Sequence, residues 1–141
     1  CLSHPNMKCP QNGQYYSLNY GNIHYLSSGV RKYIESCENK DATNGGPYTQ
    51  RYTGSLVSDI HRNLIKGGIF MYPATQKLAS GKLRLMYECN PLAFILEVAG
   101  GRAIDGNQRI LDILPSSIHE RSPLFIGSAN MIAELEACLK S

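Results

Sequence analysis

The sequence predicts an α/β fold, a layered sandwich in which a mixed, mostly buried sheet lies against helices. Stretches with apolar residues at helical spacing alternate with short apolar runs that Gly or Pro ends, and this alternation is typical of helices packed on a sheet. With 141 residues, 43% of them hydrophobic, the chain can bury one core but not two. We therefore expect residues 1–141 to form a single domain, in which residues 1–14 are a linker-like entry.

The first part of the chain predicts one strand and one helix. Residues 15–18 have the composition of a short strand. Ser28 can cap a helix that ends by Asn39. The apolar side of this helix carries Val30, Tyr33, Ile34 and Cys37. Residues 40–49 hold almost no apolar side chains, so we expect an exposed loop there.

The region from residue 51 to residue 73 predicts a helix, a tight turn and a buried strand. Helical spacing extends from Ser55 to Lys66, and two glycines end it. The apolar positions of this helix are Leu56, Val57, Ile60, Leu64 and Ile65. Residues 69–72 then form a short apolar run that Pro73 stops.

Residues 81–101 predict a helix with an acid just before it. Asn90 is a good N-cap and Pro91 suits the first helical position, so we expect the helix to begin near Pro91. The expected buried stripe is Leu92, Ile95, Leu96 and Ala99. Glu88 precedes the cap by two residues, beside the positive end of the helix dipole, where its carboxylate stays ionised and can meet a cation. The pattern alone also fits a solvated acid.

The last part of the chain predicts two strands and a helix. Residues 102–104 read as a short strand followed by a turn, and residues 110–114 are a further apolar run. Residues 116–123 are a polar connector, and residues 124–126 have the composition of a buried strand. A final helix carries on one face Met131, Ile132, Leu135 and Leu139.

Composition excludes several classes of function. The net charge is only +3, from 14 Lys and Arg against 11 Asp and Glu, far below that of a nucleic-acid-binding surface. No apolar run is long enough to span a membrane and the start does not resemble a signal peptide, so we expect a cytoplasmic location. The five cysteines lack the spacing of metal or redox sites, which indicates reduced thiols. The chain opens on Cys1 rather than Met, which we interpret as a sign of a longer protein.

Polar side chains suited to a phosphate stand where the predicted strands and helices begin or end. Arginine matches phosphate oxygens in pairs, lysine supplies a point charge, and neutral tyrosine and asparagine add directed hydrogen bonds. The candidate residues are Asn19, Arg51, Tyr52, Tyr72 and Lys82. The sequence has no Walker-type loop, HExxH or GxSxG motif. It therefore predicts a site for a phosphorylated small molecule and identifies no catalytic residue.

Three motifs, GSLVSDIHR, GGIFMYP and GKLRLMYECNPLAFILEVAGG, are similar in order and spacing to the C-terminal half of class I fructose-1,6-bisphosphatases. The resemblance extends from about residue 16 to the end of the chain, and it implies a member of the inositol-phosphatase-like group of sugar phosphatases. The implied activity is that of a Mg²⁺-dependent phosphoric monoester hydrolase of gluconeogenesis. Its substrate is fructose 1,6-bisphosphate, and its products are fructose 6-phosphate and phosphate.

The resemblance also assigns roles to the phosphate-binding candidates. Asn19, Tyr52 and Tyr72 match residues that hold the sugar 6-phosphate. Arg51 matches an arginine that reaches this phosphate from a neighbouring subunit, and Lys82 matches a lysine that contacts sugar and phosphate. A homo-oligomer, a tetramer in the family, is therefore implied, with no nucleic-acid or membrane partner.

Glu88 matches the one metal-binding carboxylate that this half of the family supplies. The segment that carries most of the metal ligands, and the AMP-binding helices, have no counterpart in the chain. The family usually has Tyr at the position of Asn22, which weakens a phosphate contact, and Met at the position of Leu56, which conserves volume. We therefore expect a substrate-binding half that is inactive alone. Two alternatives stay open: half of a sedoheptulose-1,7-bisphosphatase, and a non-catalytic phosphosugar-binding module.

Overall fold

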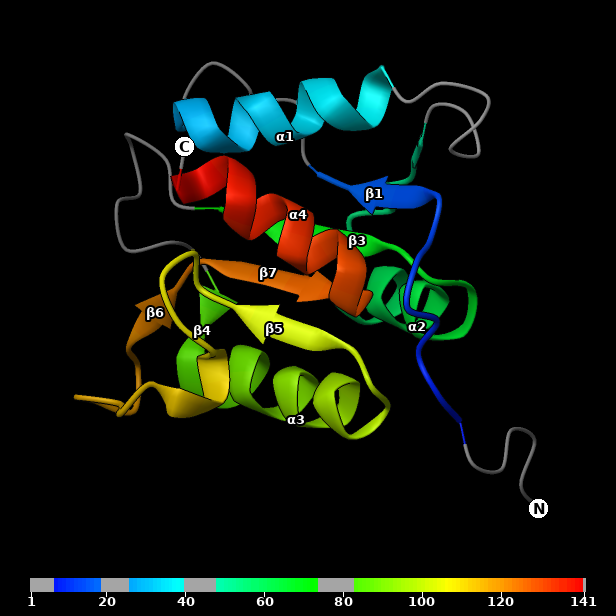
Figure 1. Cartoon of the computed structure of the whole chain (residues 1–141). Coiled ribbons are helices and arrows are strands. Elements are labelled where there is room, and N and C mark those ends of the chain that lie inside the picture. Colours follow the sequence, from blue (N-terminus) through cyan, green and yellow to red (C-terminus); the bar gives the residue numbers. More distant parts are fainter. Residues whose placement is uncertain (1–6, 19–25, 40–47, 74–82, 141) are drawn as a thin grey trace.

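The computed structural model describes residues 7–18, 26–39, 48–73 and 83–140 (Figure 1). Its strands are β1 (Tyr15–Ser17), β2 (Thr49–Gln50), β3 (Ile69–Tyr72), β4 (Leu83–Arg84), β5 (Arg102–Ile104), β6 (Arg121–Ser122) and β7 (Leu124–Gly127). Its α-helices are α1 (Ser28–Glu38), α2 (Leu56–Lys66), α3 (Asn90–Val98) and α4 (Ala129–Lys140). A π-helical turn, Leu85–Cys89, precedes α3, and Ile110–Asp112 is a 3₁₀ turn. Most of the predicted loop, residues 40–47, lies outside the described residues.

Five of the strands form one mixed sheet in the order β2-β1-β3-β7-β5. β1 is parallel to β2 and to β3, whereas β7 is antiparallel to β3 and to β5. β4 and β6 pair antiparallel in a separate two-stranded sheet. The mixed sheet of the predicted α/β class is therefore present.

Alternate residues of the central strands point into two separate cores, because successive side chains of a strand face opposite sides. Phe70 of β3 and Ile126 of β7 belong to the cluster that includes residues of α2 and α3. Met71 and Phe125, their neighbours in the chain, belong to the cluster that includes residues of α1 and α4. Figure 1 shows α1 and α4 together on one side of the sheet and α3 on the other. The predicted layered sandwich is confirmed, and the continuous apolar runs follow from strands that are buried on both faces.

Helices α1, α2 and α4 lie where the apolar spacing predicts them. Ser55 caps α2, since its Oγ accepts a hydrogen bond from the Ser58 N–H at 3.5 Å, and Gly67 with a φ of 83° follows the last residue. α1 is capped one residue earlier than predicted, by Ser27, whose Oγ accepts from the Val30 N–H at 3.4 Å. None of the helices that the structure describes has the length and apolar character needed to cross a membrane.

The sequence does not predict the strands β2 and β6. β2 begins at the last residue of the segment expected to be a loop, and the Thr49 N–H donates to the Gln14 carbonyl at 2.6 Å and the Arg51 N–H to the Tyr16 carbonyl at 3.0 Å. β6 lies inside the expected polar connector and pairs with β4. Each strand has two residues and a partner that is distant in the chain, so no local pattern could indicate it.

The central helical segment begins earlier than predicted. It starts with the π-helical turn, which runs directly into α3, and Asn90 has a helical φ of −63° and ψ of −49°, so it is not an N-cap. The Leu85 N–H donates to the Glu120 carbonyl at 2.8 Å. Leu85 and Cys89 are both fully buried. Burial of these two side chains outweighs the local capping preference of Asn90.

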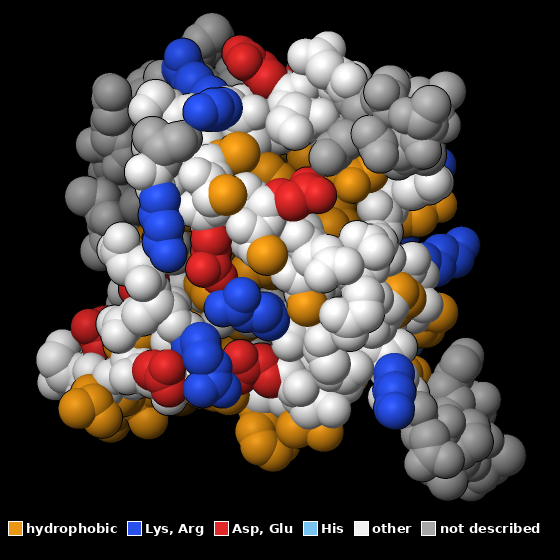
Figure 2. Space-filling view, viewed as in Figure 1, with side chains coloured by type: hydrophobic (Ala, Val, Ile, Leu, Met, Phe, Trp, Pro, Cys, Tyr) orange, Lys and Arg blue, Asp and Glu red, His pale blue; other side chains and the backbone are white. Residues whose placement is uncertain are grey.

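The buried face of α3 also differs from the prediction. Ala93 and Leu96 are buried, whereas Ile95, expected in the buried stripe, is 50% exposed. Phe94 and Val98 are 62% and 73% exposed. Figure 2 shows hydrophobic side chains gathered along the lower edge of the molecule, where α3 lies in Figure 1. In this chain α3 therefore presents an apolar face to solvent as well as one to the core.

Candidate functional site

Three of the candidate residues, Tyr52, Tyr72 and Glu88, line one cavity of about 220 Å³. They come from three separate parts of the chain: the segment before α2, the end of β3 and the π-helical turn before α3. The other lining residues are Gly54, Leu56, Phe70 and Leu83. The cavity thus lies where the ends of several elements meet, which is where α/β proteins commonly bind ligands.

The strand β3 positions Tyr72 through the two-residue period of a strand. Phe70 and Tyr72 share a face, and their ring centroids lie 6.4 Å apart. Phe70 is buried in the core cluster beside α2 and α3, and Tyr72 packs against the same cluster while it remains partly exposed. Both residues line the cavity, where Tyr72 contributes a phenol and Phe70 an apolar ring.

The segment between β2 and α2 positions Tyr52. Gly54 lies two residues further on with a φ of 86°, a left-handed conformation that side chains disfavour and that turns the chain into the helix. Leu56, the first residue of α2, then also lines the cavity. The first turn of a helix presents unpaired backbone N–H groups and a partial positive charge, so this rim favours anionic ligands.

Glu88 lies in the π-helical turn, between residues that are anchored in the core. Leu85 and Cys89 are fully buried, whereas Glu88 is partly exposed and its Oε1 accepts a hydrogen bond from the Arg84 N–H at 3.4 Å. Burial, with a smaller contribution from the Glu88 carboxylate, raises the pKa of the Cys89 thiol to about 12. Cys89 is therefore a neutral core residue, and Glu88 is the group of this turn that can meet a ligand.

Among the described residues, no further candidate lines the cavity. Asn19, Asn22 and Lys82 lie outside the described residues. Arg51 is exposed and does not line the cavity. Within the described part of the chain, the cavity wall therefore holds one carboxylate, two phenols and no lysine or arginine.

The donor set fits a metal ion only in part. Mg²⁺ prefers oxygen ligands, and it usually takes one or two protein carboxylates besides water and substrate phosphate. Glu88 can supply one such oxygen. Among the residues that the structure describes, no three His, Cys, Asp or Glu side chains come together as a metal site. A metal ion at Glu88 would therefore need further ligands from outside the described residues, from water or from the substrate.

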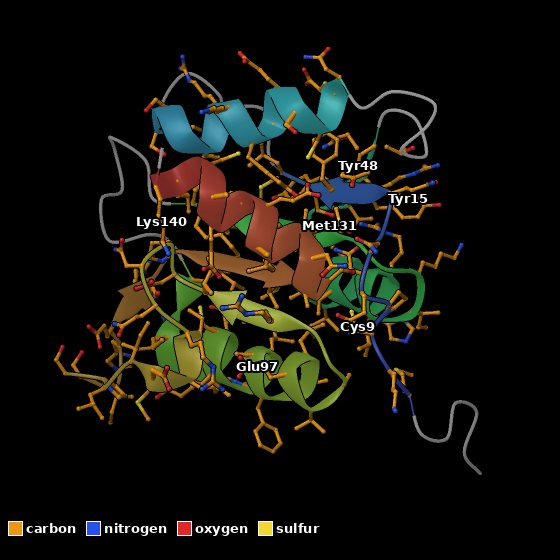
Figure 3. All side chains as sticks on the ribbon, in the orientation of Figure 1. Cys9, Tyr15, Tyr48, Glu97, Met131 and Lys140 are labelled. Carbon is orange, nitrogen blue, oxygen red and sulfur yellow. The ribbon has the colours of Figure 1, made fainter. Side chains whose placement is uncertain are left out.

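A larger cavity, of about 610 Å³, lies in a different part of the molecule. Its wall includes Tyr15, Tyr48, Lys66 and Glu134, and Figure 3 shows the first two near β1. None of the candidate residues that the structure describes lines it. Volume alone therefore favours this cavity, whereas the chemistry predicted from the sequence favours the smaller one.

Sequence reasoning missed several residues that build the site. Phe70 of β3 and Leu83 of β4 line the cavity with apolar side chains. Their role in the cavity depends on where the fold places the two strands, and the local sequence does not show this. Gly54 had a recognisable signal, because a glycine directly before a Ser N-cap often takes a positive φ. Leu56, noted as a departure from the expected Met, proves to be a wall residue.

Comparison with known proteins agrees with the motifs. The family described as fructose-1-6-bisphosphatase, C-terminal domain, matches residues 9–140. A relative from Cytophaga hutchinsonii, described as fructose-1,6-bisphosphatase class 1, is 58% identical over 140 residues. The match covers 99% of this chain and 40% of that relative, so the chain spans less than half of the relative's length.

Proposed function

The chain belongs to the family of fructose-1,6-bisphosphatase C-terminal domains, and from this membership we propose that it supplies the sugar-phosphate-binding part of a Mg²⁺-dependent fructose-1,6-bisphosphatase. The whole enzyme hydrolyses fructose 1,6-bisphosphate to fructose 6-phosphate and phosphate. Support comes from the 58% identity to the Cytophaga hutchinsonii protein of that name.

The observation that carries the proposal is the convergence of Tyr52, Tyr72 and Glu88 on one cavity. The two phenols donate hydrogen bonds to the sugar 6-phosphate without adding charge, and the N-terminal end of α2 at the rim favours the same anion. The cavity of about 220 Å³ is smaller than a typical ligand pocket. This size suits a partial site whose other walls, and most of whose charges, come from other residues.

The missing charges and further polar contacts are assigned to other candidate residues. Lys82, which supplies a charge, and neutral Asn19 complete the contacts to sugar and phosphate within the same subunit. Arg51, which is exposed, reaches the phosphate of a neighbouring subunit in a homo-oligomer, for which a tetramer is the family expectation. We place the protein in the cytoplasm, where the four described cysteines, none of which is in a disulfide, remain reduced.

Glu88 is the described residue of this chain that would hold Mg²⁺. When bound, the ion would supply positive charge to stabilise the negative charge that develops on the transferred phosphoryl group. The other residues of the chain bind and orient the sugar: the phenols of Tyr52 and Tyr72 fix the 6-phosphate end, and the apolar ring of Phe70 excludes water from the base of the cavity.

The proposal is tested on the purified full-length protein. We expect Mg²⁺-dependent release of phosphate from fructose 1,6-bisphosphate. Tyr72→Phe removes one hydroxyl and keeps the ring, so KM should rise roughly ten- to hundredfold, as for the loss of one hydrogen bond to a charged group, while kcat changes little.

The same assay separates the alternatives. Faster turnover of sedoheptulose 1,7-bisphosphate would identify the other sugar phosphatase. Binding of fructose 6-phosphate without turnover of either bisphosphate would identify a non-catalytic module. Absence of both binding and turnover would refute the sugar-phosphate site itself.

A further inference from the structure

An ion pair on α2, with a buried carboxylate and a partly buried guanidinium, contacts the backbone on both sides of Tyr52. Asp59 is 0% exposed, and its carboxylate accepts hydrogen bonds from the Thr53 N–H, at 3.3 Å to Oδ1 and 3.2 Å to Oδ2. The same carboxylate forms a salt bridge with Arg62 Nη1 at 3.0 Å, three residues further along the helix. Neither residue lines the cavity.

Arg62 continues this network to the sheet. Its Nη2 donates to Ser17 Oγ on β1 at 2.8 Å and to the Arg51 carbonyl oxygen at 3.2 Å. The guanidinium also lies 5.8 Å from the centroid of the Tyr15 ring. Its side chain is 20% exposed, so most of this contact is sheltered from water.

The two backbone groups held by the pair are the ones that define the conformation of Tyr52. The Arg51 carbonyl belongs to the peptide bond before Tyr52, and the Thr53 N–H belongs to the peptide bond after it. Hydrogen bonds to the peptide groups on both sides restrict φ and ψ of Tyr52, and with them the direction of its Cα–Cβ bond and the rotamers it can adopt. The Arg51 N–H is itself fixed by the Tyr16 carbonyl at 3.0 Å.

Stability alone is a weak reason to bury such a pair. The desolvation cost of a buried salt bridge often equals or exceeds its Coulombic gain, and well-packed apolar residues usually serve as well. This pair forms directed hydrogen bonds with the peptide groups on either side of a ligand-binding residue. Apolar side chains cannot orient peptide groups in this way. Small displacements of such a residue are costly for binding.

We propose that Asp59 and Arg62 are positioning residues that hold Tyr52 in the orientation that binds the sugar phosphate. This inference rests on the proposed function of the cavity. It adds two residues to the site that act through the backbone of Tyr52 and do not touch the ligand.

The test uses the full-length protein, with fructose 6-phosphate as the binding probe and fructose 1,6-bisphosphate as the substrate. Arg62→Lys keeps the positive charge but loses the fork, in which Nη1 binds Asp59 while Nη2 reaches Ser17 and the Arg51 carbonyl. We expect the Kd for fructose 6-phosphate and the KM to rise about tenfold, with kcat changed less than about twofold.

A double-mutant cycle separates positioning from a general effect on folding. In a Tyr52→Phe background, where the hydroxyl is already lost, Arg62→Lys should weaken binding by less than about threefold. Glu97→Gln serves as the control, because it removes the charge from the pair of Glu97 on α3 (Figure 3) with Arg109 at 2.7 Å, and neither of these residues lines the cavity. It should leave Kd, KM and kcat unchanged.

Equal losses from Arg62→Lys in both backgrounds, or no loss in either, would overturn the positioning role. If Arg62→Lys does not fold, Ser17→Ala carries the test, because it removes one anchor of Arg62 and keeps both charges. The same non-additivity with Tyr52→Phe is expected at a smaller size, and its absence would overturn the inference. Failure of the wild-type protein to bind fructose 6-phosphate would instead refute the proposed function.

Discussion

The contacts of Glu88 allow its proposed role as a metal ligand to be tested without a large change in the stability of the fold. Its Oε1 accepts a hydrogen bond from the Arg84 N–H, and the side chain is partly exposed. In Glu88→Gln the amide oxygen can accept the same bond, but the negative charge is lost. Turnover of the full-length enzyme should therefore fall by roughly a hundredfold or more, while stability changes by less than about 0.5 kcal/mol.

The measurement is a comparison of kcat with the Kd for fructose 6-phosphate. Binding of the product should survive in Glu88→Gln, since the 6-phosphate contacts come from other residues. Wild-type turnover in this variant would show that Glu88 is not a metal ligand.

Cys89 gives the protein a dependence on alkaline pH. Burial raises the pKa of this thiol to about 12, against an ordinary value of 9.0. Above pH 9 the unfolded chain loses this proton and the folded chain keeps it, so stability is full below pH 9 and declines as pH rises towards 12. The loss from this thiol alone is up to about 1.4 kcal/mol per pH unit.

The check is the thermal unfolding midpoint between pH 8 and pH 11 under reducing conditions. Cys89→Ala lowers the midpoint at every pH because it leaves a cavity, but its midpoint should decline less steeply with pH than that of the wild type. Parallel declines would show that Cys89 does not titrate as its burial implies.

At the scale of the element, α3 offers a matched pair of neighbouring residues. Leu96 is 1% exposed and Ile95 is 50% exposed. In the 141-residue chain, Leu96→Ala should lower the free energy of unfolding by about 2–5 kcal/mol, and Ile95→Ala by less than about 1 kcal/mol. Denaturant titration of the two variants checks this. Equal losses in the free energy of unfolding would show that Ile95 is buried, as the sequence pattern predicts.

Local patterns predicted the long elements well and the short ones poorly. The spacing at α1, α2 and α4, and the apolar runs at β3 and β7, report burial directly, because the core requires those residues. β2 and β6 depend on pairing with distant segments, which no local pattern contains. The prediction of Asn90 as an N-cap is wrong because the buried Leu85 starts the helical segment five residues before Asn90.

The candidate site divides in the same way. Residue types at element ends indicated Tyr52, Tyr72 and Glu88, and the structure brings these three to one cavity; their roles in binding remain predictions. The network of Asp59 and Arg62 could not be found from the sequence, because its contacts join α2 to β1 and to the segment before the helix.

At the scale of the whole molecule, the single carboxylate at the cavity limits what the chain can do alone. A site for two or more metal ions needs several converging carboxylates, and the described residues provide no such group. The isolated 141-residue chain should therefore show no Mg²⁺-dependent release of phosphate above background. Efficient turnover by highly purified chain would contradict this.

Arg51 connects the site to the proposed oligomer. Its side chain is exposed and does not line the cavity that holds Tyr52. If Arg51 acts across an interface, mixing full-length Arg51→Ala subunits with Tyr72→Ala subunits concentrates both lesions in one site and leaves the other whole. Partial recovery of activity is expected in mixtures shown to exchange subunits, whereas no recovery would remove Arg51 from the neighbouring site.

The most direct test of the sugar-phosphate site is a crystal structure of the full-length protein with fructose 6-phosphate and Mg²⁺. The account predicts the 6-phosphate within hydrogen-bonding distance, about 2.5–3.2 Å, of the Tyr52 and Tyr72 hydroxyls, with Glu88 as a ligand of the metal. Fructose 6-phosphate bound instead in the larger cavity lined by Tyr15 and Tyr48, with the smaller cavity empty, would contradict it.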